Sequence, residues 1–103
     1  MNLGELTLEI VKALEGTAFE VSLPDGSTTT MKLEQALAYE VQQRRPRRAP
    51  KRIPFSLFFL GDASLVLPQG MYSFRCEALT LESLFIVPLD HSEEGTEYEA
   101  VFT

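Results

Sequence analysis

The sequence predicts one small α+β domain over residues 1–103, mainly β, with one N-terminal helix packed on a six-stranded antiparallel sheet that curls or closes into a small barrel. Three observations carry this prediction. The chain of 103 residues is long enough for one hydrophobic core. Its segments beyond residue 17 alternate apolar and polar side chains at the period of a β-strand. Turn-forming residues separate these segments every 8 to 12 residues (roughly), which is typical of small sheets and barrels.

The first elements expected are a helix and a β-hairpin. Apolar residues recur at spacings of three and four, so we expect a helix over residues 3–14, with Gly16 as its stop signal. A strand over about residues 17–23 follows, because apolar and polar side chains alternate there. The residues after this strand are those that tight turns require: Pro24, Asp25, Gly26 and Ser27.

The second arm of this hairpin, residues 28–42, fits two patterns. Apolar residues alternate at period two, as in a strand: Met31, Leu33, Leu37, Tyr39 and Val41. A second set lies near one helical face: Leu33, Ala36, Leu37, Glu40 and Val41. We favour a strand, because the turn before it requires a partner strand directly afterwards and because the helical stripe contains a glutamate. A partly helical segment remains the alternative.

Four further strands are expected in the second half of the chain, over about residues 54–60, 71–77, 81–89 and 96–102. The run Leu84–Val87 is continuously apolar, which is typical of a strand covered on both faces. A polar turn is expected over residues 90–95, before the last strand.

Charge is distributed very unevenly along the chain. The formal net charge is −6, yet six of the nine basic residues lie within one stretch of nine positions: Arg44, Arg45, Arg47, Arg48, Lys51 and Arg52. The rest of the chain has three basic residues against fifteen acidic ones, a formal charge of −12. Prolines and like charges predict that residues 43–53 form an exposed loop outside the sheet. We interpret these six residues, the basic stretch, as a candidate partner-binding site.

No pattern of residues indicates catalysis, a metal or a cofactor. His91, the only histidine, lies beside Asp90 in an expected polar turn, where nothing holds the geometry that a base or a metal ligand needs. Cys76 is expected to be a small core residue on the inner side of its strand. We therefore expect a protein that is not an enzyme.

The only cysteine cannot form an internal disulfide, which favours a reducing, cytoplasmic compartment. Glu5 and Glu9 lie where an export signal would have a basic and then an apolar region, so no signal peptide is expected. The apolar runs are far shorter than the roughly 20 residues of a membrane-spanning helix, so we expect no membrane contact.

Four motifs in the second half occur in a fixed order: PFSLFFLGD, LVLPQGMYSF, LESLFIVPLD and EYEAVF. At residues 54–61, 67–72, 84–88 and 98–102 they resemble the DUF6916 family of small bacterial domains of unknown function. The basic stretch, and Leu60 where an arginine is expected, depart from that family. The resemblance implies a compact β domain without an assigned activity, with relatives in phage-tail-like or cell-surface assemblies.

These observations favour a non-enzymatic structural or adaptor domain that acts through protein–protein contacts. Its strand edges and its basic stretch would bind an acidic protein or a second copy of the chain. One alternative is a nucleic-acid-associated protein that uses residues 44–52, although this stretch has no aromatic residue to stack on bases and the rest of the chain is acidic. Another is a small-molecule binder with a barrel mouth lined by Tyr72, Arg75 and Glu77.

Overall fold

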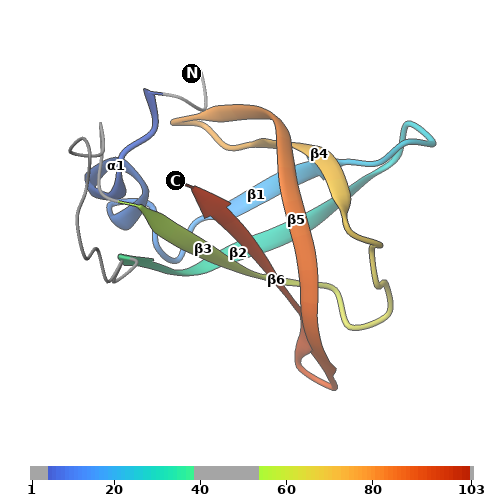
Figure 1. The fold of residues 1–103 in the computed structure, drawn as a ribbon. Coiled ribbons are helices and arrows are strands. Elements are labelled where there is room, and N and C mark those ends of the chain that lie inside the picture. The colour runs from blue at the N-terminus through green and yellow to red at the C-terminus, as the bar shows by residue number, and fades with distance from the viewer. Residues whose placement is uncertain (1–4, 39–53, 103) are drawn as a thin grey trace.

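Six antiparallel strands close into a barrel, with a short helix at one end (Figure 1). The structure is a computed structural model and describes residues 5–38 and 54–102. Its elements are α1 (Leu8–Lys12), β1 (Ala18–Ser22), β2 (Thr28–Ala38), β3 (Phe55–Gly61), β4 (Gly70–Arg75), β5 (Thr80–Ser92) and β6 (Gly95–Phe102). Around the barrel the strand order is β1-β2-β3-β6-β5-β4. The predicted fold class is confirmed, and the sheet closes.

The helix spans Leu8–Lys12 and is much shorter than the predicted range 3–14. The prediction was wrong at both ends, because residues 6 and 7 precede the helix and residues 13 and 14 follow it. Positions 3 and 4 lie outside the described residues. Thr7 has an extended backbone, and its hydroxyl accepts a hydrogen bond from the Ile10 N–H at 3.4 Å, so it caps the helix and fixes its start. After Lys12 the chain leaves the helix in a tight turn, in which the Leu14 N–H bonds the Val11 carbonyl at 3.0 Å. Helix α1 packs against β2 and buries Val11.

The predicted hairpin of β1 and β2 is confirmed. In its turn, the Asp25 carboxylate accepts the Ser27 N–H at 2.9 Å and the Ser27 hydroxyl at 2.5 Å. Gly26 adopts φ +89°, a conformation that glycine reaches without strain. Residues 28–38 are strand throughout, so the helical alternative is wrong there; residues 39–42 lie outside the described part of the chain.

A β-bulge between Leu33 and Gln35 interrupts the pairing of β2 with β3. One Glu15 carboxylate oxygen accepts the N–H of Ala36, just past this bulge, at 2.8 Å. The Gly16 N–H also donates to the Leu33 carbonyl at 2.6 Å. These bonds satisfy backbone groups that the bulge frees, and they attach the segment after α1 to the barrel.

The predicted ends of β4 and β5 need correction. Strand β4 stops at Arg75, two residues early, because the Cys76 N–H turns to bond the Leu79 carbonyl at 2.8 Å. Strand β5 continues through Ser92, so the expected polar turn over residues 90–95 is wrong. His91 pairs with Thr96, which leaves only residues 93 and 94 between β5 and β6.

Aromatic side chains fill the barrel interior. The Phe59 ring lies 4.7 Å from the Phe74 ring and 5.7 Å from the Phe19 ring, centroid to centroid. Tyr98 is fully buried, and its hydroxyl oxygen accepts the Leu67 N–H at 2.8 Å, which fastens the segment between β3 and β4 to the core. The interior is therefore a packed core.

Tyr72 is a second buried tyrosine, 7% exposed, and its hydroxyl donates to the Pro68 carbonyl at 2.8 Å. Burial, and secondarily the nearby Tyr98, raise the pKa of Tyr72 above its ordinary value. The phenol of the unfolded chain therefore ionises first, and stability falls as the pH rises above about 10.

We expect Tyr72→Phe to reduce this alkaline loss. Below pH ~10 the variant loses about 1 kcal/mol of unfolding free energy with the hydrogen bond to Pro68. Above that pH its stability falls less steeply than that of the wild type, because one ionising group is gone. Urea unfolding from neutral pH to about pH 11 measures both effects, and parallel pH curves for the two proteins would contradict the assignment.

Candidate interaction surface

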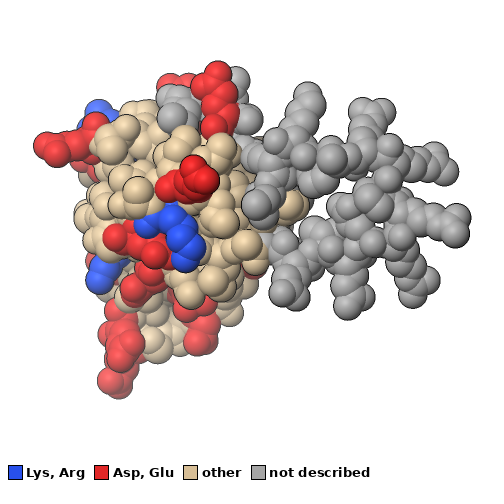
Figure 2. Space-filling view, turned by 90° about the vertical axis from the view of Figure 1, so that its left-hand side faces the viewer, with Lys and Arg blue, Asp and Glu red and all other residues tan. Residues whose placement is uncertain are grey.

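The body of the protein is strongly acidic. The predicted site residues Arg44, Arg45, Arg47, Arg48, Lys51 and Arg52 all lie outside the described residues. Within residues 5–38 and 54–102 there are three basic residues, Lys12, Lys32 and Arg75, against fourteen acidic ones, a formal charge of −11. Acidic side chains accordingly cover more of the visible face than basic ones (Figure 2).

Two of these three basic side chains already have acidic partners. The Arg75 guanidinium lies 2.5 Å from the Glu20 carboxylate, as their strand register requires, and the Lys12 ammonium lies 3.7 Å from Glu15. No ion pair is found for Lys32 within the described part of the chain. The basic stretch holds six of the nine basic residues of the whole chain.

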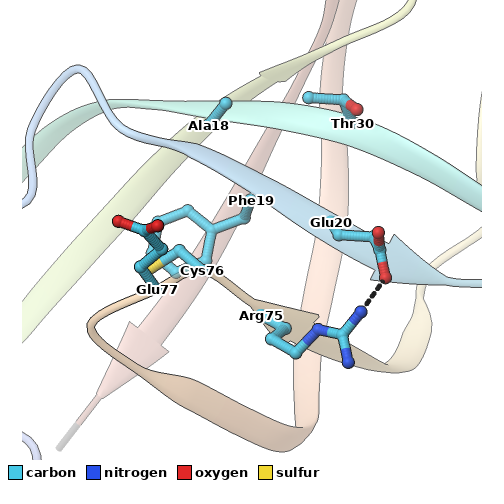
Figure 3. Close-up of a pocket in the computed structure, with 7 residues that line it drawn as sticks. All are labelled: Ala18, Phe19, Glu20, Thr30, Arg75, Cys76 and Glu77. Carbon is cyan, nitrogen blue, oxygen red and sulfur yellow. Dashed lines mark hydrogen bonds and ion pairs between the residues drawn. The ribbon is translucent and has the colours of Figure 1, made fainter.

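A shallow hollow of about 450 Å³ lies where β1 and β4 separate. Its lining residues are Ala18, Phe19, Glu20, Thr30, Arg75, Cys76 and Glu77 (Figure 3). Arg75 and Glu77 line it as the small-molecule alternative requires, but Tyr72 lies outside its lining. The Arg75–Glu20 ion pair neutralises the one cation of the hollow, so an anionic ligand would have to displace Glu20 to bind.

Neither Cys76 nor His91 belongs to a group of potential catalytic or metal-binding side chains in the described part of the chain. Cys76 lies just past the end of β4, half-buried and packed against the core, instead of inside the expected strand. His91 lies in strand β5 and not in a turn, and its Nε2 atom lies 2.7 Å from the Ala63 carbonyl oxygen. No cluster of three potential metal ligands occurs among residues 5–38 and 54–102.

The closed barrel also changes how a partner can bind. Every strand has a hydrogen-bonded neighbour on both sides, so none is free along its whole length to accept a partner strand. A partner strand could therefore pair only along part of a strand, and binding through strand edges stays a prediction. No helix in the described part of the chain is long and apolar enough to cross a membrane.

A set of apolar side chains faces outward from three adjacent strands, β4, β5 and β6, and we call it the outer strip. Four of the six strongly exposed large apolar residues in the described part of the chain belong to it. These four are Met71 (65% exposed), Phe85 (46%), Leu89 (48%) and Val101 (51%). The half-buried Val87 of β5 lies among them. Scattered exposed apolar residues are ordinary, but several on one face mark interaction sites.

Strand register brings these residues together. Met71 of β4 pairs with Phe85 of β5, and Val87 of β5 pairs with Glu99 of β6. Val101 follows two positions after Glu99 and therefore points to the same side. β5 lies between the other two strands (Figure 1), so it forms the centre of the outer strip.

Three carboxylates lie in or beside the outer strip: Glu97, Glu99 and Asp90, which pairs with Glu97 and points to the same face. Glu99 has Val87 on one side and half-buried Phe58 of β3 on the other. Glu97 pairs with Leu60 on β3 and with Asp90 next to Leu89 on β5. A partner for this face needs both apolar groups and positive charge.

The apolar run of β5 predicted a strand covered on both faces, and this is wrong for its outer face. The signal that identifies the outer strip lies in the neighbouring strands. Met71 and Val101 occupy positions whose strand neighbours on the same face are polar: Ser73, Arg75, Glu97 and Glu99. Apolar residues at such positions break the alternation that a purely structural sheet needs.

A family model described as a domain of unknown function, DUF6916, matches residues 6–102. The match extends the similarity from the four motifs of the second half to α1 and the first hairpin. No curated protein and no solved structure matches the chain.

Proposed function

The chain belongs to the DUF6916 family, and we propose that it is a non-enzymatic structural or adaptor domain that acts through protein–protein contacts. The observation that carries the proposal is the outer strip, in which exposed apolar side chains gather on one face of a barrel with a packed interior. A phage-tail-like or cell-surface assembly is the setting that we propose for such contacts.

The distribution of charge supports the same proposal. The described body has a formal charge of −11, whereas the basic stretch holds six cations within nine positions. Opposite charges on separate parts of one chain steer association and fix its orientation. We therefore propose a protein partner, either an acidic protein or a second copy of the chain.

Nucleic-acid binding through the basic stretch is the alternative that the six cations favour. A phosphate backbone approaching them would also approach the acidic body, which repels it. We expect no gel shift of a DNA or RNA duplex at about 0.05 M salt. A shift that disappears as salt is raised would favour the nucleic-acid alternative.

The test of the proposed function replaces all six basic residues by serine. We expect the wild type, at low salt, to capture specific proteins from its source cells or to self-associate, and the serine variant to lose both. The matched control changes the five arginines to lysine, which preserves charge and should preserve the contacts to a large extent. If captured proteins and solution mass are the same for all three chains, the electrostatic part of the proposal is wrong.

A further inference from the structure

We propose that the outer strip is the docking surface for residues 44–52 of a second copy of this chain, so that copies associate head to tail. This inference rests on the proposed function and names both surfaces of the contact. Its first support is composition, because the strip combines exposed apolar groups with the Glu97 and Glu99 carboxylates.

Charge opposes the symmetric alternative, in which two outer strips face each other. That arrangement would bring the Glu97 and Glu99 side chains of both copies into one contact and partly remove them from water. Like charges brought together in this way oppose association. The occupant of the strip must therefore bring cations.

A second copy has one cluster of such cations, the basic stretch, besides the single Lys32. In its described body Lys12 and Arg75 are paired, and Lys32 stands alone on β2. The basic stretch supplies six cations, with the apolar residues Pro46, Ala49 and Pro50 between them. A second copy can thus meet both requirements of the strip with this one segment.

The spacing of the charges also matches. Glu97 and Glu99 lie two positions apart on one strand, which separates them by about 6.6 Å along it. A peptide bound in extended form carries residues such as Arg45 and Arg47 at the same separation. Proline lacks an N–H group, so this sequence is better suited to a sheet face than to pairing with a strand edge.

The same segment of the same copy is the competing occupant of the outer strip. Solution mass distinguishes the two, because only contact with a second copy raises the mass above that of the monomer.

The test measures the solution mass of the full chain by sedimentation or light scattering. At about 0.05 M salt we expect at least twice the monomer mass of 11.6 kDa, and at about 0.5 M salt the monomer. A head-to-tail contact does not limit itself to two copies, so the mass should rise with protein concentration. A monomer under all these conditions would overturn the proposal.

Two variants, mixed, test the direction of the contact. Glu97→Lys with Glu99→Lys spoils the strip but keeps the basic stretch, whereas the six-serine variant keeps the strip but lacks the stretch. Each alone should be monomeric at low salt, and the mixture should form a one-to-one dimer. The matched control, Glu93→Lys with Glu94→Lys in the β5–β6 turn, should associate like the wild type.

The remaining outcomes also decide the matter. If the mixture stays monomeric, or if the Glu97 and Glu99 variant associates like the wild type, the head-to-tail contact is wrong. The proposed function survives such a result if the same variant loses a protein that the wild type captures. It fails with the further inference only if no variant alters any protein contact.

Discussion

Replacing Phe59 by alanine is expected to lower the free energy of unfolding by about 3–5 kcal/mol. Phe59 is fully buried, and its ring contacts those of Phe19 and Phe74 in the centre of the barrel. The substitution removes apolar surface and leaves a cavity that a closed barrel cannot easily collapse. Since small domains are stable by only about 5–15 kcal/mol, urea unfolding should detect the loss directly.

Phe85→Ala is the matched control, because it makes the same chemical change on the outside of the same barrel. Phe85 is 46% exposed, so we expect a loss of about 1 kcal/mol or less. Losses of equal size for the two variants would contradict the division between core and outer strip. A stable Phe85→Ala protein would also show that this aromatic residue is dispensable for folding and available for contact.

The sequence allowed most of the barrel to be predicted because several of its strands alternate apolar and polar side chains over much of their length. In β6, Tyr98, Ala100 and Phe102 point inward, and the turn at Gly26 specified the pairing of β1 with β2. These signals are local and repeat with period two, so they can be recognised without knowing what each strand packs against. The strand order and closure depend on contacts between distant segments and leave no local pattern.

The errors at element ends also have physical causes. The spacing over residues 3–14 fits a helix, but the extended backbone and cap at Thr7 begin it late, and tertiary contacts at Glu15 draw the chain toward β2. At Asp90 and His91, polar residues favoured a turn, yet pairing with β6 keeps them in the strand. Polarity alone does not distinguish a turn from the exposed end of a long hairpin.

The candidate site was only half accessible from the sequence. The basic stretch is visible as charge, whereas the outer strip joins single residues from three strands and becomes a surface only in the folded barrel. Within β5 the run from Leu84 to Val87 indicated a buried strand, because an apolar residue needed for contact has the same chemistry as one needed for the core. Burial of each position, not composition, separates the two.

Replacing Gly95 by alanine is expected to lower the free energy of unfolding by about 3 kcal/mol or more, since backbone strain and overpacking each cost about 1–3 kcal/mol. Gly95 begins β6 with φ +151°, which side-chain-bearing residues rarely adopt. An added Cβ would lie 2.8 Å from the Leu60 Cδ1 and clash with the Gly61 carbonyl oxygen of β3. That oxygen belongs to a paired strand, so relief requires β3 and β6 to move apart.

Gly26→Ala separates strain from steric conflict. Gly26 also has a positive φ, but a Cβ there would meet nothing within 4 Å. We therefore expect it to cost only about 1 kcal/mol, from the left-handed backbone alone. Thermal or urea unfolding of the two variants and the wild type measures the difference. Equal losses would mean that β3 and β6 tolerate the extra methyl group. The close approach of Gly95 to Gly61 would then not be needed to hold β6 beside β3.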